Sequence, residues 1–403
     1  MKILFVTSFY YPDTMGGSDR YLFEVTTRLA RLGHEVTVMT AKQGDEFQAY
    51  ERIEDIEVYR YNLNRSSSLR YYLSSIFNAQ ALGTRLLREH RYDLVVLSHI
   101  LPSFGMYLAD KKIPKVYHYY ASYLLEYRDK LKWLVVHKPS FSLVVKLPFL
   151  KMAGIVLRRI EKYLVWKTKK IMVLSEYSKG ELETVYQQGH KAAIIPSGVA
   201  IERFKPLGDK TKIRQEFDIP TDRPVLLTIR RLYHRMGLEE LLLALKEVKK
   251  VIPDIVLLIG GKGPLLDKLK KDTAEYGIEE NVRFLGFIAE KDIAGYYNAA
   301  DYFILPSRAL EGFGLVTLEA LACGLPVLGT PVGATPKLLR SLEPELVFED
   351  SSARGMASKI ITMLGDYQGY EQLSERCCEY AQQNFNWDKI IPKIEQFYQA
   401  TVL

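Results

Sequence analysis

Cysteines are few and long apolar runs are missing, and each shortage excludes a class of protein. The chain has three cysteines, Cys323, Cys377 and Cys378, in 403 residues. So few thiols build neither a disulfide framework nor a Cys-rich metal site, which favours a reducing compartment. No run of about 18 uncharged apolar residues occurs, so a membrane-spanning helix is not expected. The expected strand KILFVT at 2–7 follows no charged and apolar leader, and we therefore expect a cytoplasmic protein.

The common motifs for dinucleotides, phosphate loops and metals are missing as well. The pair Gly16-Gly17 follows the first strand, but no G-x-G-x-x-G occurs there, which disfavours a dehydrogenase. In GGKGPLLDKL, Lys262 precedes a glycine instead of the Ser or Thr of an NTPase phosphate loop. No D-x-D sequence occurs, and the seven histidines lack a metal-ligand spacing such as H-E-x-x-H. We therefore expect neither a metal ion nor a cofactor.

Expected strands and helices alternate along the chain in two series. A length of 403 residues exceeds one ordinary core, which predicts two domains. The alternation restarts after the polar stretch at 197–212, and alternation of this kind is typical of parallel sheets with helices on both faces. We predict an α/β fold with two Rossmann-like doubly wound domains, residues 1–200 and 201–384, that face a central cleft. The expected strands are 2–7, 35–40, 56–61, 93–98, 115–119, 170–175, 192–196, 225–229, 255–260, 281–287, 301–307 and 325–330.

Positive charge is concentrated between residues 128 and 170. This segment has twelve Lys or Arg against Asp129 and Glu161, a balance of +10, whereas the whole chain carries +7. Basic residues alternate with Trp, Leu and Phe, and such a segment can lie on an anionic membrane surface. Two core helices with solvated basic faces are the alternative. Nucleic acid is not expected as a partner, because the segment is rich in aliphatic residues and has no binding motif.

The stretch EGFGLVTLE at 311–319 places two acids around a glycine-rich turn. It follows the expected strand DYFILPS and opens a helix that ends near Gly324. Unpaired amides at a helix start bind phosphate, and carboxylate oxygens accept hydrogen bonds from sugar hydroxyls. A nucleotide-sugar diphosphate fits both features. A plain helix start with acids near the positive end of the helix dipole explains the same residues.

Two further loops follow expected strands and can meet an anion. RRLYHRMG at 230–237 holds three arginines, and the planar guanidinium group suits phosphate. Gly16 and Gly17 allow close backbone approach to an anion, although a simple turn explains them equally. His118 in KVYHYY is either a strand-end residue or a ligand contact.

The combination resembles the retaining glycosyltransferases of family 4, which have two Rossmann-like domains in the arrangement called GT-B. The pair of glutamates with seven residues between them is the signature of that family. FNWDKIIPKIEQFY resembles the final helix of the family, which implies that residues 385–403 cross back to the first domain. The other matching stretches are YYPDTMGGSDRYLFEVTTRLARLGHEVTV, VLSEYSK, IPSGVAIERFKP, LLIGGKGPLLDKL, VRFLGF and DYFILPSRALEGFGLVTLEALACGLPVLGT.

The resemblance implies roles for individual residues. Glu319 would bind the ribose hydroxyls of the donor, Glu311 would lie beside the donor sugar, and Arg231 would bind the diphosphate. The family commonly has Lys at the position of Met236, and Arg235 would supply that charge here. The remaining implied donor contacts are Gly16, Gly17, His118, Arg283 through its backbone, Gly312, Phe313, Gly314 and Leu315.

The resemblance implies a metal-independent transfer of a hexose from a nucleotide-diphosphate sugar to an acceptor hydroxyl. The basic segment favours a lipid or lipid-linked glycan acceptor at the cytoplasmic face of a membrane. A soluble acceptor, as in a sucrose- or trehalose-type synthase, is the first alternative. A non-catalytic nucleotide-sugar sensor and an epimerase on the same fold are further ones.

Overall fold

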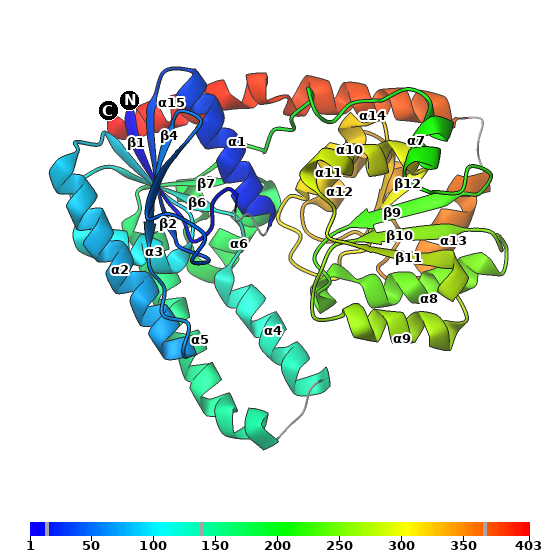
Figure 1. The fold of residues 1–403 in the computed structure, drawn as a ribbon, viewed down its shortest axis with the longest axis horizontal. Coiled ribbons are helices and arrows are strands. Elements are labelled where there is room, and N and C mark those ends of the chain that lie inside the picture. The colour runs from blue at the N-terminus through cyan, green and yellow to red at the C-terminus, as the bar shows by residue number, and fades with distance from the viewer. Residues whose placement is uncertain (13–15, 138–140, 366–368) are drawn as a thin grey trace. The chain divides into compact units, whose positions relative to one another are not determined.

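The computed structural model describes residues 1–12, 16–137, 141–365 and 369–403. They form two compact units, Met1–Pro196 with Ile390–Leu403, and Ser197–Lys389 (Figure 1). The sequence predicted a change of domain after residue 200. Each unit is built around its own sheet.

An eight-stranded sheet forms the centre of the first unit. Its strand order is β3-β4-β2-β1-β5-β6-β7-β8, and all neighbours are parallel except β3, which pairs antiparallel with β4. The strands are β1 (Lys2–Val6), β2 (Glu35–Ala41), β3 (Tyr50–Ile53), β4 (Ile56–Tyr61), β5 (Leu94–Leu97), β6 (Lys115–Tyr119), β7 (Lys170–Val173) and β8 (Ala192–Ile194).

Helices cover both faces of this sheet, as the alternating side chains of β1 show. Leu4 and Val6 join the core cluster that includes residues of α2, α3, α5 and α6. Phe5 points to the other face, where its ring lies 6.3 Å from that of Tyr398 in α15. The helices are α1 (Gly17–Arg31), α2 (Ser68–Glu89), α3 (Ile100–Ala109), α4 (Tyr123–His137), α5 (Phe141–Lys167), α6 (Glu176–Tyr186) and α15 (Trp387–Val402), of which the residues from Ile390 onward belong to this unit.

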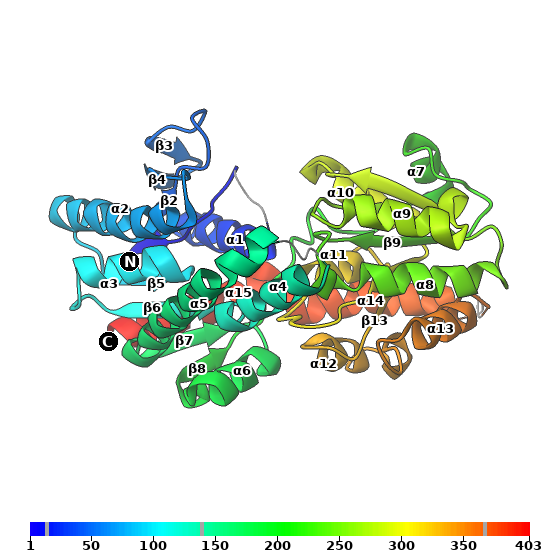
Figure 2. The ribbon, with the colours of Figure 1, turned by 90° about the horizontal axis from the view of Figure 1, so that it is seen from below.

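The second unit has a five-stranded parallel sheet with the order β11-β10-β9-β12-β13. Its strands are β9 (Val225–Ile229), β10 (Val256–Gly260), β11 (Val282–Gly286), β12 (Tyr302–Leu305) and β13 (Val327–Gly329). Its helices are α7 (Lys210–Glu216), α8 (Leu238–Lys249), α9 (Leu266–Tyr276), α10 (Glu290–Ala299), α11 (Leu315–Ala322), α12 (Thr335–Arg340), α13 (Ala353–Gly365) and α14 (Tyr370–Phe385) (Figure 2).

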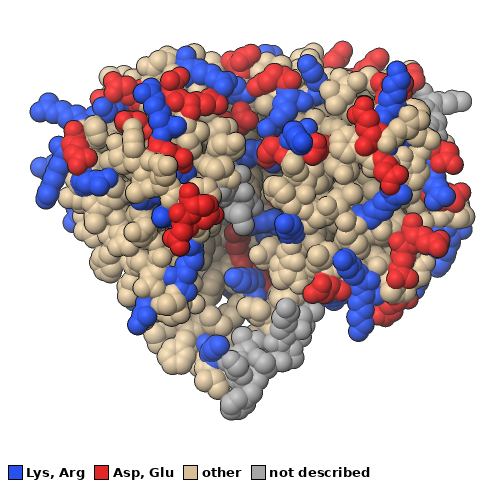
Figure 3. All heavy atoms as spheres, viewed as in Figure 1, with Lys and Arg blue, Asp and Glu red and all other residues tan. Residues whose placement is uncertain are grey.

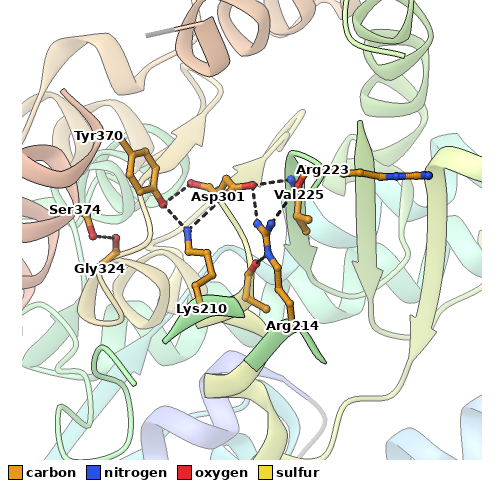
Figure 4. A network of polar contacts seen from close by, with 9 residues as sticks. Lys210, Arg214, Arg223, Val225, Asp301, Gly324, Tyr370 and Ser374 are labelled. Atoms are coloured by element: carbon orange, nitrogen blue, oxygen red, sulfur yellow. Dashed lines mark hydrogen bonds and ion pairs between the residues drawn. The ribbon is translucent and has the colours of Figure 1, made fainter. Parts of the chain in front are cut away.

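Asp301 ties several elements of the second unit together at the start of β12 (Figure 4). Its carboxylate accepts hydrogen bonds from Arg214 Nη2 at 2.8 Å, Lys210 Nζ at 3.1 Å and the Val225 amide at 2.7 Å. Its carbonyl accepts one from the Tyr370 hydroxyl at 2.9 Å. Asp301 therefore links α7 and β9 to β12 through its side chain, and α14 through its carbonyl.

The strand order reverses once in each sheet. In the first unit the reversal lies between β1 and β5, and in the second it lies between β9 and β12. Ligands of doubly wound sheets bind beyond the carboxyl ends of the strands at this point, because the loops from the two strands diverge to opposite faces. The residues that follow β1, β5, β9 and β12 are therefore the first candidates for a binding site.

The predicted α/β class with two doubly wound sheets is confirmed. The sequence did not predict the short edge strand β3. Among the described residues, helices that combine enough length with enough apolar character to cross a bilayer are not found.

Candidate active site

A buried ion pair lies at the strand reversal of the second unit. Arg230 directly follows β9, and Ser307 and Glu311 follow β12. Arg230 Nη2 donates to Glu311 Oε2 at 2.9 Å and to Ser307 Oγ at 3.0 Å, and Ser307 Oγ donates to the same carboxylate oxygen at 2.6 Å. The side chains of Arg230 and Glu311 are only 5% and 13% exposed. The loops that follow β9 and β12 are therefore joined by a charged and largely buried contact.

Arg230 retains hydrogen-bonding capacity that the described residues do not use. Its Nε and Nη1 atoms are buried without a partner among those residues. Burial and the nearby charges of Arg235 and Arg231 lower the pKa of Arg230, whereas Glu311 acts in the opposite direction. Buried donors without partners are costly, and an oxygen-rich ligand can satisfy them. The arrangement is suited to hold an anion or a hydroxyl-rich group.

The turn that carries Glu311 is held in an unusual backbone conformation. Leu310, immediately before Glu311, has φ = 58°, in the left-handed region that residues other than glycine rarely adopt. Gly333, with φ = 64°, packs against the turn so closely that a Cβ there would lie 2.0 Å from the Glu311 carbonyl oxygen. The Ala334 amide donates to the same carbonyl at 2.9 Å. A crowded, strained turn of this kind is typical of a functional site.

Helix α11 begins directly after this turn. Its N-cap is Gly314, with φ = 81°. Because glycine has no side chain, this residue makes no side-chain cap to the first amides of the helix. Gly312 and Leu315 flank this position, and the Phe313 ring packs edge-on to that of Phe385 at 6.1 Å. The positive end of the helix dipole is thus presented beside the Arg230 pair, as an anion site requires.

Glu319 lies inside α11 and is 4% exposed. Its Oε2 atom accepts a hydrogen bond from the Tyr297 hydroxyl of α10 at 2.9 Å. The carboxylate is therefore fixed in orientation. The predicted contact with ribose hydroxyls stays a prediction.

Arg231 and Arg235 occupy different surroundings from Arg230. The Arg231 side chain is exposed, and its guanidinium lies over the Tyr233 ring at 5.6 Å. Arg235 is half-buried and donates through Nη1 to the Leu310 carbonyl at 3.2 Å, which places its charge beside the strained turn. The structure thus brings two of the three arginines into contact with the Glu311 turn and leaves Arg231 facing solvent.

Arg283 was implied as a donor contact through its backbone, and this contact stays a prediction, although the residue lies near the start of its strand. Arg283 is the second residue of β11, whose carboxyl end is Gly286. Its side chain turns to Asp218, in the loop that precedes β9. It therefore lies toward the opposite edge of the sheet from the Arg230 pair.

His118 was expected near the end of the strand 115–119, and it lies in β6, next to the last residue Tyr119, where it is 1% exposed. Its Nε2 atom is 2.7 Å from the Tyr398 hydroxyl, and its Nδ1 atom is 3.4 Å from that of Tyr120. Burial lowers the pKa of His118 to about 3, so the ring is neutral. Tyr120 is the first residue beyond the strand.

The strand reversal of the first unit carries a second polar cluster, which the sequence reasoning missed. His99 follows β5, and its Nδ1 atom lies 2.8 Å from Thr7 Oγ1 and accepts the Ser8 amide at 3.2 Å. Because the amide must donate, the ring proton of the neutral imidazole sits on Nε2, which is 3.9 Å from Asp19 Oδ1. Asp19 belongs to the first turn of α1, directly after Gly16 and Gly17.

The sequence did contain signals for the missed residues. Arg230 and His99 each stand one or two positions after a buried strand that neighbours the reversal. Arg230 was named in its loop, but its neighbour was chosen for the site. His99 was considered only as a metal ligand. No group of three or more potential metal ligands occurs among the residues that the structure describes.

Comparison with known proteins agrees with the fold. The family model described as Glycosyltransferase Family 4 matches residues 15–203, and the one described as Glycosyl transferases group 1 matches residues 209–384. The chain belongs to the family 4 glycosyltransferases, which have the GT-B fold.

Individual relatives differ in their acceptors. The GDP-mannose-dependent alpha-(1-6)-phosphatidylinositol monomannoside mannosyltransferase of Mycobacterium tuberculosis is 27% identical over 62% of this chain and 66% of its own length, just under two thirds. The alpha-monoglucosyldiacylglycerol synthase of Streptococcus pneumoniae is 24% identical over 100% of this chain and 86% of its own. The sucrose-phosphate synthase of Thermosynechococcus elongatus has a TM-score of 0.81 at 22% identity, covers 99% of both chains, and shows the likeness of fold.

Proposed function

We propose that this chain is a retaining, metal-independent hexosyltransferase. It transfers a hexose from a nucleotide-diphosphate sugar to a hydroxyl of a lipid-linked or cell-envelope glycan at the cytoplasmic face of a membrane. The observation that carries the proposal is the Arg230–Glu311 pair, whose remaining guanidinium donors are buried and unused beside the start of α11. A sugar diphosphate offers the oxygens that such donors need.

The second unit binds the donor. Arg231, Arg235 and the amides from Gly312 to Leu315 meet the diphosphate, because they combine mobile positive charge with a helix N-terminus. Glu311 lies beside the donor sugar and Glu319 accepts from the ribose hydroxyls. In the first unit, Gly16 and Gly17 approach the phosphate, and the enclosed His118 acts as a positioning residue that orients Tyr120.

The transfer proceeds on one face of the sugar. The acceptor oxygen forms a bond to the anomeric carbon on the side from which the diphosphate leaves. The bond between that carbon and the phosphate oxygen breaks, the electron pair passes to the phosphate, and a phosphate oxygen takes the acceptor proton. Arg231 and Arg235 stabilise the charge that grows on the leaving group, and one such contact typically contributes about 3 kcal/mol.

The choice of a lipid-linked acceptor rests on two relatives. The descriptions of the mannosyltransferase and of the alpha-monoglucosyldiacylglycerol synthase named above each include a glycolipid. A soluble acceptor of the sucrose or trehalose type is the alternative, and a non-catalytic nucleotide-sugar sensor is a second one. The donor nucleotide and the hexose are to be identified by a screen of donors.

The test is a screen of nucleotide-diphosphate hexoses with membrane lipid extract, followed by mass spectrometry and NMR of the product. We expect one donor to give a glycolipid whose anomeric configuration equals that of the donor, without added divalent metal and in the presence of a chelator. Glu311→Gln should lower the rate by about 10²-fold or more, whereas the exposed control Glu280→Gln should not change it.

Each other outcome rejects part of the proposal. Inversion of the anomeric centre would exclude the retaining mechanism, and loss of activity in chelator would exclude metal independence. Transfer to a soluble sugar alone would favour the synthase alternative. Binding of a donor without any turnover would favour the sensor.

A further inference from the structure

Helix α5 exposes a continuous line of apolar side chains. Val145, Phe149, Met152 and Val156 are 54%, 71%, 62% and 50% exposed. Their spacings of four, three and four residues place them along one side of the helix. Ile155, 56% exposed, lies next to this line. Single exposed apolar residues are ordinary, but a line of them on one helix marks an interaction surface.

The exposed apolar stripe, Val145, Phe149, Met152 and Val156, is held outward by packing elsewhere on α5. Leu157, Ile160 and Leu164 are buried in the core of the first unit. Gly154 lies against the Tyr127 ring of α4, where an added Cβ would be 2.9 Å from the nearest ring carbon. The Tyr127 hydroxyl donates to the Leu150 carbonyl at 2.8 Å. Helix α5 therefore cannot turn its apolar stripe inward without losing these contacts.

The buried Glu161 fixes the neighbouring helix α4 to α5. Its two carboxylate oxygens accept the amides of Tyr123 and Leu124, at 2.8 and 3.1 Å, which are the first residues of α4. The Tyr186 hydroxyl donates to the same carboxylate at 2.5 Å. The two helices run side by side in both ribbon views (Figures 1 and 2). The stripe thus lies on a helix that is fixed to its neighbour α4 by hydrogen bonds.

The exposed charges of α5 itself, beside the stripe, have a single sign. Acidic and basic side chains alternate over most of the face in Figure 3. Between residues 145 and 167, by contrast, Glu161 is the only acid, and it is buried and fully engaged. The exposed basic residues of this range are Lys146, Lys151, Arg158, Arg159, Lys162 and Lys167.

The apolar stripe and the basic side chains of α5 together indicate the kind of partner that this helix binds. A second copy of the chain would bring the same positive charges against the stripe, and like charges in contact are unfavourable. Nucleic acid would satisfy the charges but leave the apolar stripe without a partner. A bilayer with anionic headgroups satisfies both, because apolar side chains enter the acyl boundary and Lys or Arg bind the lipid phosphates.

We infer that α5 docks this protein on an anionic bilayer, with the line from Val145 to Val156 buried in the interface. The basic side chains beside that line bind the headgroups, and the helix lies along the membrane surface. The inference rests on the proposed function, since a lipid-linked acceptor is what such docking would bring within reach. Beyond the proposed function, the inference specifies the helix, and the side of that helix, that contacts the membrane.

The experiment is co-flotation of the full chain with phosphatidylcholine vesicles, with and without phosphatidylglycerol. We expect flotation only with the anionic lipid. The double variant Phe149→Glu and Met152→Glu should weaken it by about tenfold or more. The matched control is Phe287→Glu in the second unit, because Phe287 is 68% exposed, and it should float as the unchanged protein does.

A second pair of variants tests the charge. Arg158→Gln with Arg159→Gln should weaken flotation by about thirtyfold, at roughly 1 kcal/mol for each basic residue near the surface. Lys270→Gln with Lys271→Gln, an exposed basic pair on α9, is the control and should have no effect. Equal far-ultraviolet circular dichroism and melting midpoints will show that every variant is folded.

The outcomes separate this inference from the proposed function. Flotation that is absent, or unchanged in the Phe149 and Met152 variant, overturns the docking surface. Equal flotation with neutral vesicles overturns the role of the basic side chains. Flotation of a protein that shows no glycosyl transfer with any donor would leave the docking surface supported and reject the proposed function. Loss of flotation in the Phe149 and Met152 variant, together with hexosyl transfer to lipid by the unchanged protein, would support both.

Discussion

Replacing Arg230 and Arg231 by alanine, one at a time, tests the site most sharply. The two residues are adjacent in the sequence, yet one side chain is buried against Glu311 and the other is exposed over Tyr233. The two variants should therefore fail in different ways.

Arg230→Ala should destabilise the second unit. The change leaves the carboxylate of Glu311, 13% exposed, without its opposite charge. Breaking a buried ion pair in this way typically costs about 3–5 kcal/mol. For a unit of this size the melting midpoint should fall by roughly 6–20 °C. Activity is lost as well, since the turn at Glu311 loses its support.

Arg231→Ala should affect catalysis and leave stability nearly unchanged. Exposed side chains away from packing contacts usually change stability by about 0.5 kcal/mol or less. If Arg231 stabilises the leaving diphosphate, the turnover number should fall by about 10²–10³-fold.

The assay combines thermal unfolding with initial rates for the donor that the screen identifies. A double variant, Arg230→Ala with Glu311→Gln, adds an internal check. Removing the stranded charge should restore part of the lost midpoint, so the two changes should be less than additive. Equal midpoints for Arg230→Ala and Arg231→Ala would refute the burial argument, and an unchanged turnover number for Arg231→Ala would refute the diphosphate contact.

Three other predictions concern stability, pH and the first unit. Asp301→Ala should lower the free energy of unfolding by about 3–5 kcal/mol in denaturant titration, because the carboxylate holds two basic side chains, whereas Asp350→Ala, which removes an exposed carboxylate bound to Ser352, should lower it much less. Burial beside other carboxyl groups raises the pKa of Glu181 to about 7 from its ordinary value of 4.5, so the folded chain keeps a proton that the unfolded chain releases. The free energy of unfolding should therefore fall as the pH rises between these two values, and a slope that persists in Glu181→Gln would contradict this cause. His99→Ala should lower kcat/KM by up to about tenfold through loss of the Nδ1 acceptor for the Ser8 amide, His99→Asn should lower it less, and equal losses would point to a packing role only.

The glycine-rich turn and its helix could be predicted because their determinants are local. An apolar run, a glycine pair and a helical repeat occur within 301–324, and the structure places β12 and α11 there. The positions after strands were informative for the same reason, since parallel strands bring their carboxyl ends to one edge.

The orientation of individual side chains could not be predicted in the same way. Arg230 and Arg231 have the same chemistry, and which of them turns inward depends on Glu311, which is about 80 positions away in the sequence. The side of β6 on which His118 lies depends on Tyr398, 280 positions away. The position of Arg283 depended on where β11 begins, and strand ends are poorly fixed by local pattern. Long-range packing therefore decided each placement that the sequence missed.

The composition of the first unit has a consequence for how the protein is made. Residues 390–403 belong to this unit although they are synthesised after the whole of the second one. Until they arrive, Phe5 and His118 lack the ring of Tyr398 that covers them. A nascent chain should therefore expose the part of its N-terminal sheet that Tyr398 covers throughout translation of residues 197–389, and chaperones that bind apolar surface should hold it longest during that interval.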